Sequence, residues 1–349
     1  MDHCLRAIEK GMTAGSHGIP LIGTGDWNDG MNRVGEKGQG ESVWLAWFLC
    51  DVLQRFAEIC DKQGYPDRGQ KYRLKAIEYA AAVEKFAWDG AWYRRAYTDE
   101  GTPIGSSLNQ ECQIDSIAQS WAILSGAGND ERSRRAMMSV MENLVRFDDR
   151  LILLFTPPFD KSSVDPGYIK GYPPGTRENG GQYTHAATWT AWAFAALGDG
   201  KQAGHLFELL NPIFHSDNEE KATVYRVEPY VICADIYSQP PFTRRGGWTW
   251  YTGSAAWMFR LGIEAILGFH KIGNSLKIDP VIPPEWDEFE IQYRFGKSTY
   301  FILVRNPDHV SRHVRTVQSD GKQIDPMSIP LVDDGLIHRI EVTMGEIKE

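Results

Sequence analysis

The spacing of apolar residues predicts helices along most of the chain up to about residue 270. Residues 42–60 are apolar on most faces, as in a helix buried between neighbours. Further segments repeat apolar residues at helical spacing and are separated by short Gly/Asp turns. We expect helices at 42–60, 70–86, 114–124, 131–145, 184–197, 201–210 and 254–267. Helical hairpins without intervening strands must pack helix on helix, as a bundle, a solenoid or a closed toroid.

The periodicity changes from about residue 274 onward. Phe289, Ile291, Tyr293 and Phe295 alternate with polar residues, as expected for strands. The stretch 331–344 suggests a closing hairpin around Asp333-Asp334-Gly335. The pattern therefore predicts a mainly α-helical region, 1–270, followed by a small antiparallel β-domain, 271–349.

Long loops lie between the predicted hairpins, notably 146–183 and 235–252, and loops of this length are usually functional. The glycine-dense loop 23–44 has the most informative chemistry, because Asp26 and Asp29 flank Trp27. An acid that must hold a proton near neutral pH needs an apolar neighbour or a second carboxylate to raise its pKa above about 3.9. An ordinary surface turn rich in Asp, Asn and Gly explains the same residues, and local sequence leaves both interpretations open.

Composition narrows the function classes. A net charge of −9 argues against a nucleic-acid surface, and no apolar run is long enough for a membrane span. The N-terminus lacks a signal-peptide pattern. The five cysteines lack CxxC spacing, which indicates reduced thiols in the cytoplasm and no metal site. The 12 Trp, 14 Tyr and 15 Phe are typical of carbohydrate-active clefts, although aromatic residues more often belong to the core.

Long motifs of this chain resemble one enzyme family. They are GDWNDGMN (25–32), GESVWLAWFL (40–49), PPFDKSSVDPGYIKGYPPGTRENGGQYTHAATW (157–189) and GGWTWYTGSAAWMFR (246–260). The chain is similar to glycoside hydrolase family 94, the inverting cellobiose and chitobiose phosphorylases, and especially to the C-terminal phosphorylase region of cyclic β-1,2-glucan synthases.

The resemblance implies the later helices of an (α/α)6-barrel followed by the C-terminal β-domain. Family members carry a β-sandwich, a linker and the first barrel helices before the GDWND loop, which here comes 25 residues from Met1. We therefore expect association with a second copy or with the missing barrel half, and low activity of the chain alone. The resemblance also implies a cytoplasmic location, either for the chain alone or for a membrane-anchored synthase that contains it.

The resemblance also implies site residues. Asp29 would be the catalytic acid, and we expect it to be buried where it protonates the departing sugar oxygen. His185, protonated beside the anion, Thr252 and the Gly253 amide would bind phosphate, a co-substrate that replaces any cofactor. Trp27, Glu178, Asn179 and Gln182 would contact the sugar. Weaker candidates are Arg94, Arg95, Arg244 and Arg245 for sugar or phosphate, and Tyr168 and Lys170 for linkage preference.

Three functions remain open at this level. The first is phosphorolysis of a β-glucan, most simply a β-1,2-linked one, to give α-glucose 1-phosphate. The second is inverting hydrolysis with Glu178 as general base. The third is a catalytically silent carbohydrate-binding module. Asp26 is expected to be a structural loop acid, and Glu41 to stabilise the start of the helix that follows it through the helix dipole.

Overall fold

The computed structural model describes residues 1–250 and 252–346, and it divides into two compact units. The first unit comprises Met1–Ala193 and Leu209–Ala255, and the second comprises Phe194–Glu208 and Ala256–Glu349. The second unit thus includes helical segments as well as strands, so this division differs from the boundary expected at residue 270.

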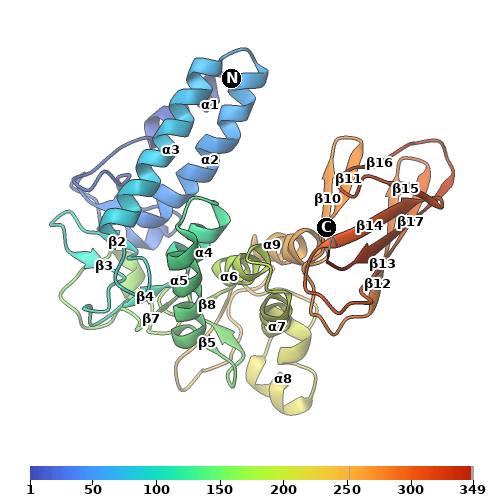
Figure 1. The fold of residues 1–349 in the computed structure, drawn as a ribbon. Coiled ribbons are helices and arrows are strands. Elements are labelled where there is room, and N and C mark those ends of the chain that lie inside the picture. The colour runs from blue at the N-terminus through green and yellow to red at the C-terminus, as the bar shows by residue number, and fades with distance from the viewer. Residues whose placement is uncertain (251, 347–349) are drawn as a thin grey trace. The chain divides into compact units, whose positions relative to one another are not determined.

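The predicted helices are present within a few residues of their expected bounds (Figure 1). They are α2 (Val43–Lys62), α3 (Pro66–Phe86), α4 (Ser116–Leu124), α5 (Asp130–Asn143), α6 (Thr184–Ala196), α7 (Gly200–Leu210) and α9 (Ser254–Arg260), which continues as a π-helix over Leu261–Ile266. The pattern did not predict α1 (Asp2–Gly11), α8 (Glu219–Tyr225) or the 3-10 turns Asp29–Met31, Tyr168–Gly171 and Pro212–His215.

Three helices of the first unit are joined through a cluster of tryptophans. Trp44 of α2, Trp121 of α4 and Trp189 of α6 lie with ring centroids 5.2–6.3 Å apart. Each of the three is no more than 8% exposed. Large aromatic rings bury much apolar area and gain from edge-to-face contact. The cluster therefore holds α2, α4 and α6 together.

A short strand precedes each of these three helices, which corrects the expectation of hairpins without strands. The strands are β1 (Glu41–Ser42), β4 (Ile114–Asp115) and β8 (Gln182–Tyr183), and they pair antiparallel with β2 (Ala96–Tyr97), β7 (Phe155–Thr156) and β9 (Asp235–Ile236). Two further small pairings are β2 with β3 (Pro103–Ile104) and β5 (Val145–Arg146) with β6 (Leu151–Ile152). These pairings attach the long loops to the N-terminal ends of the helices. A strand of two residues is too short to show the alternation of apolar and polar residues from which strands are predicted.

The second unit contains the predicted β-region. A five-stranded sheet has the order β12 (Glu288–Phe295), β13 (Ser298–Arg305), β17 (Ile337–Met344), β14 (Val314–Ser319) and β15 (Lys322–Ile324). A smaller sheet has the order β10 (Phe269–Ile272), β11 (Ser275–Ile278) and β16 (Ile329–Pro330). The pairing is antiparallel except between β13 and β17, which run parallel.

The closing hairpin predicted at 331–344 is wrong. The final strand β17 does not return along the segment before it but inserts between β13 and β14 (Figure 1). Alternation defines which residues of a strand face the core, but it does not choose the neighbouring strand. Across the part of the chain that the structure describes, no helix has both the length and the apolar character needed to cross a bilayer.

Candidate functional site

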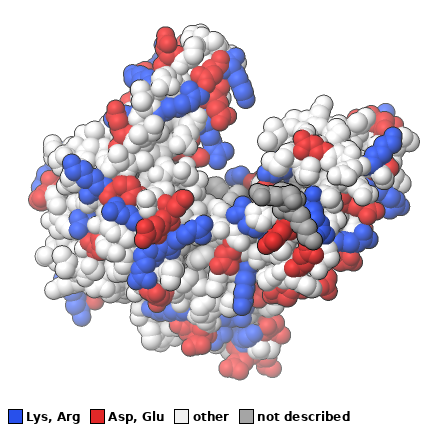
Figure 2. Space-filling view, in the orientation of Figure 1, with Lys and Arg blue, Asp and Glu red and all other residues white. Residues whose placement is uncertain are grey.

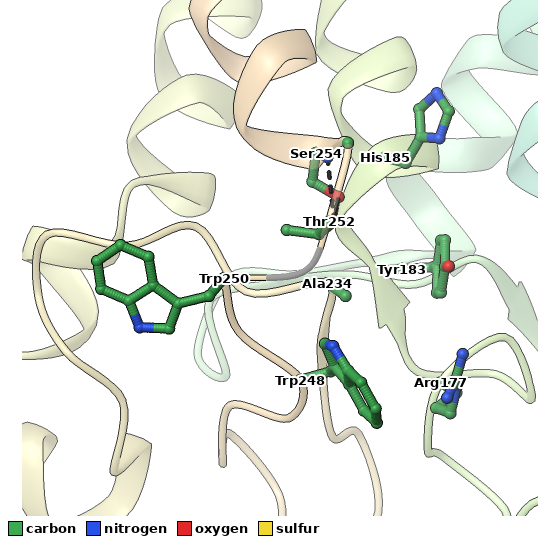
Figure 3. A pocket seen from close by; sticks show the side chains of 9 residues that line it. Arg177, Tyr183, His185, Ala234, Trp248, Trp250, Thr252 and Ser254 are labelled. Carbon is green, nitrogen blue, oxygen red and sulfur yellow. Dashed lines mark hydrogen bonds between the residues drawn. The ribbon is translucent and has the colours of Figure 1, made fainter.

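A cavity of about 730 Å³ lies in the first unit, beside the start of α6 and the segment before α9. Its lining consists of Arg177, Tyr183, His185, Ala234, Trp248, Trp250, Thr252, Gly253 and Ser254 (Figure 3). The three residues expected to bind phosphate, His185, Thr252 and Gly253, therefore line one cavity although they come from distant parts of the sequence. No carboxylate is among these lining residues, so the cavity can receive an anion without direct repulsion from its wall.

The Thr252–Ser254 turn offers polar groups to this cavity. The Thr252 hydroxyl accepts a hydrogen bond from the Ser254 amide at 3.1 Å and donates to the Ser254 hydroxyl at 2.8 Å. Thr252 thereby caps the start of α9 itself. A Cβ placed on Gly253 would meet no atom within 4 Å, so the backbone of Gly253 borders open space and a ligand can approach it closely.

His185 is held by Trp27. The Trp27 indole Nε1–H donates to Nδ1 of His185 at 3.3 Å, and the two rings meet edge to face. Since Nδ1 accepts this hydrogen bond, the neutral ring carries its proton on Nε2. Burial lowers the pKa of His185 to about 4. Burial therefore favours the neutral ring, which can donate through Nε2.

Asp26 and Arg95 form a buried ion pair beneath the GDWND loop. The Arg95 guanidinium donates to both carboxylate oxygens of Asp26 at 2.7 Å, and neither side chain is exposed. The Ser42 hydroxyl also donates to Asp26 at 2.6 Å. Burial alone raises the pKa of Asp26, but Arg95 and the hydrogen bonds outweigh it and hold this pKa below its usual value. Asp26 is therefore a structural acid and supplies no proton-sharing partner to Asp29.

A second carboxylate contacts the same guanidinium. Asp115, the N-cap of α4, lies 3.3 Å from Nε of Arg95 and accepts a hydrogen bond from the Ile117 amide at 2.9 Å. Burial raises the pKa of Asp115 to about 6, against the opposing effect of Arg95. Arg95 thus connects the loop that contains Asp26 to the start of α4. Asp26 in turn binds Ser42 at the start of α2. The burial of Arg95 excludes the sugar or phosphate contact considered from the sequence.

Asp29 lies on the same loop but on its outer side. It is the first residue of the 3-10 turn Asp29–Met31 and is exposed, so the expectation of a buried acid is wrong. The Tyr168 hydroxyl hydrogen-bonds the Asp29 carboxylate. Burial, followed by this bond, raises the pKa of Tyr168. The two turns are also linked through Asn32, whose side-chain oxygen accepts from the Tyr168 amide at 3.0 Å.

The remaining predicted sugar contacts separate into two groups. Trp27 packs against Tyr183 and His185, and the nearly buried Glu178 pairs with Arg177 at 3.4 Å, so both border the cavity through residues that line it. Asn179 is fully buried and bonds the backbone of Phe159 and Tyr172. Gln182 is fully buried and accepts from the Ile152 amide. Asn179 and Gln182 therefore support the loop instead of facing the cavity.

The expectation for Glu41 is also corrected. Glu41 is buried, and its carboxylate accepts from the amides of His17 and Ile19 and contacts Nδ1 of His17 at 2.5 Å. It therefore anchors the segment before the loop, whereas the side chain of Ser42 caps α2. Arg94 is paired with Asp89.

Sequence reasoning missed the residues that shape the opposite side of the cavity. Asp235 is buried and accepts hydrogen bonds from the amides of Arg177 at 2.9 Å and Trp248 at 3.1 Å. The Arg177 guanidinium lies over the rings of Tyr172 and Trp248, 5.1 and 5.9 Å from their centroids. Arg177 directly precedes Glu178, but no local signal connects it with residue 235 or 248. The pairing of β8 with β9 brings these distant segments together.

The charge on the visible surface is mixed. Acidic and basic side chains alternate over the face shown in Figure 2.

Comparisons with known proteins assign this chain to an enzyme family. The model of the glycosyl hydrolase 94 superfamily catalytic domain matches residues 1–268. The chain therefore belongs to the glycoside hydrolase 94 family. A solved structure titled sialidase is similar in fold, with a TM-score of 0.59 and 12% identity over 83% of this chain and 26% of that one.

Curated relatives include a synthase and several phosphorylases. The cyclic beta-(1,2)-glucan synthase NdvB of Rhizobium meliloti is 51% identical over 87% of this chain and 11% of its own length. Solabiose phosphorylase of Paenibacillus borealis is 32% identical over 98% of this chain and 44% of its own. An N,N'-diacetylchitobiose phosphorylase of Vibrio proteolyticus is 31% identical over 92% and 39%. The chain thus spans less than half the length of each of these relatives.

Proposed function

We propose that this chain is a phosphorylase-type domain that transfers a glucosyl unit between a β-glucan and inorganic phosphate. The observation that carries the proposal is the cavity lined by His185, Thr252, Gly253 and Arg177 in a member of this family. The Ser254 hydroxyl, which accepts from Thr252 and keeps its own proton, can join an imidazole N–H, a guanidinium and an accessible backbone in satisfying the oxygens of a phosphate dianion. The 51% identity to a cyclic β-1,2-glucan synthase supports a β-1,2-linked substrate.

The proposed reaction needs one general acid. A phosphate oxygen attacks the anomeric carbon, the bond from that carbon to the glycosidic oxygen breaks, and Asp29 donates its proton to the departing oxygen. Attack from the opposite face inverts the β-linkage and gives α-glucose 1-phosphate and the shortened glucan. Asp29 is exposed, so the bound sugar must itself exclude water from this carboxyl group during the transfer.

Glu178 is poorly placed to act as the base of a hydrolase. Its carboxylate is paired with Arg177 and hydrogen-bonds the Tyr183 hydroxyl, and burial followed by the charge of Glu178 raises the pKa of Tyr183. A base engaged with a cation is less available to activate water. This argues for phosphate as the attacking group.

A second candidate is a module that binds glucan without turning it over. The exposure of Asp29 favours it, since general acids normally work where water is excluded. Calorimetry with a β-1,2-gluco-oligosaccharide, combined with an assay for glucose 1-phosphate, separates the two functions. Binding without product in the presence of phosphate would support the silent module.

The decisive test of the first candidate compares turnover with and without phosphate. Release of glucose 1-phosphate only when phosphate is present supports phosphorolysis, whereas sugar release without it indicates hydrolysis. Asp29→Asn should reduce the phosphorolytic rate about 10²–10⁴-fold because the acid no longer carries a transferable proton. Asp148→Asn, a change at another exposed acid, is the control. Equal rates for wild type and Asp29→Asn would remove Asp29 from the mechanism.

A further inference from the structure

Three aromatic rings stand exposed beside the cavity. Tyr230 is 76% exposed, Trp250 is 70% exposed and Trp248 is 55% exposed. Trp248 and Trp250 line the cavity, and Trp250 points to the side opposite Arg177 and Tyr183 (Figure 3). Exposed apolar rings that cluster together mark a ligand or partner site more often than isolated ones do. We call Tyr230, Trp248 and Trp250 the aromatic rim.

The rim is held in place by specific contacts. The Trp250 indole N–H donates to the Glu228 carboxylate at 3.1 Å, and the Trp250 and Tyr230 rings lie 6.4 Å apart at 65°. The Trp248 amide is fixed on Asp235, and its carbonyl accepts from the Ala234 amide at 2.6 Å. Trp250 has a φ of 66°, in the left-handed region that non-glycine residues rarely adopt. The fold therefore presents the Trp250 ring at a conformational cost.

We propose that the aromatic rim binds additional glucosyl units of a β-linked gluco-oligosaccharide, beyond those held at the reacting bond. The rim is continuous with the cavity through Trp248 and Trp250. Sugar rings carry apolar C–H faces that stack on aromatic rings, while their hydroxyls need polar partners such as the carboxylate of Glu228. The inference rests on the proposed function only for the identity of the sugar.

The composition of the rim favours a sugar over a protein partner. Every large apolar side chain that is exposed between residues 226 and 250 is aromatic: Tyr230, Phe242, Trp248 and Trp250. Protein interfaces also use aromatic rings, but Trp248 and Trp250 line the same cavity as His185 and Thr252. Aromatic rings bordered by a carboxylate and a guanidinium instead match the alternating apolar and hydroxyl surfaces of a saccharide.

The test is calorimetric and needs no turnover. Affinities are measured without phosphate for β-1,2-linked gluco-oligosaccharides of two, four and six units, with wild type, Trp250→Ala, Tyr230→Ala and the control Phe242→Ala. Phe242 is 53% exposed in the same region but does not line the cavity. We expect wild type to bind the longest chain more tightly than the shortest. Each rim variant should reduce that preference about twofold to tenfold, as expected for loss of one aromatic contact, and Phe242→Ala should keep it.

Several results would overturn the proposal. They are a wild-type affinity that does not depend on chain length, no binding of any of these sugars, an equal loss in Phe242→Ala, or a change of oligomeric state in Trp250→Ala by light scattering. The last result would assign the rim to an interface between copies. If the protein prefers longer chains but releases no glucose 1-phosphate, the proposed role of the rim stands and only the proposed phosphorolysis is refuted.

Discussion

Replacing Arg95 by methionine should destabilise the first unit more than any exposed charge replacement. The change removes two 2.7 Å hydrogen bonds to Asp26 and the 3.3 Å contact with Asp115, and none of the three side chains is more than 1% exposed. Removing one partner of a buried ion pair costs about 3–5 kcal/mol, because the remaining charge is left without compensation. Here two carboxylates lose the same cation, so we expect the upper part of that range at neutral pH.

The loss should depend on pH in a defined direction. In wild type, Arg95 keeps the pKa of Asp26 below its usual value. Without the guanidinium, burial dominates at both acids and raises their pKa values. Groups with a raised folded-state pKa favour the folded protein at low pH and disfavour it once they ionise. The destabilisation by Arg95→Met should therefore shrink as the pH falls from about 7.5 toward 5.

Urea unfolding followed by tryptophan fluorescence measures this effect. Trp27, Trp44, Trp121 and Trp189 all belong to the first unit, so the signal reports on the region that contains the pair. Arg55→Met is the matched control, because its partner Asp51 is bound across an exposed helix surface, where the Arg55 side chain is 76% exposed. That control should lose about 0.3–0.5 kcal/mol. A loss below about 1 kcal/mol in Arg95→Met, or a loss that does not vary with pH, would refute the reasoning.

Two further changes test the groups around the loop. Asp115 has a pKa of about 6 when folded against an ordinary value of 3.8, so it makes the unfolding free energy fall as the pH rises from about 4 to 6. Asp115→Asn keeps an acceptor for the Ile117 amide and should flatten that slope in urea titrations, and an unchanged slope would contradict the assignment. Trp27→Phe removes the donor to Nδ1 of His185 and should release the ring from its Nε2–H tautomer. Imidazole ¹⁵N shifts identical to wild type would show that Trp27 does not set the tautomer.

Much of the helical architecture was readable from the sequence. The helices at 42–60 and 184–197 were predictable because their periodicity is local, and the structure places them at Val43–Lys62 and Thr184–Ala196. The β-region was likewise visible in the alternation of Phe289 to Phe295. The position of the last strand was not, since a strand with the same inward face can pair with several neighbours.

The same distinction between local and long-range properties applies to the candidate site. The local sequence around Asp29 left an acid site and an ordinary turn both open, and the phosphate role of Thr252 and Gly253 followed from the family resemblance. The burial of these side chains and their interaction partners cannot be read from the local sequence. The ion pair of Asp26 with Arg95 spans 69 residues, and the hydrogen bond of Trp27 with His185 spans 158.

The sequence alone therefore determined which chemical groups are present, the helical periods and the family. The tertiary structure decided that Asp26 is buried with its charge paired to Arg95, that Asp29 is exposed, and that burial favours the neutral ring of His185. The physical reason is that desolvation and ion pairing depend on which atoms surround a group in space, and contacts between distant segments determine those surroundings.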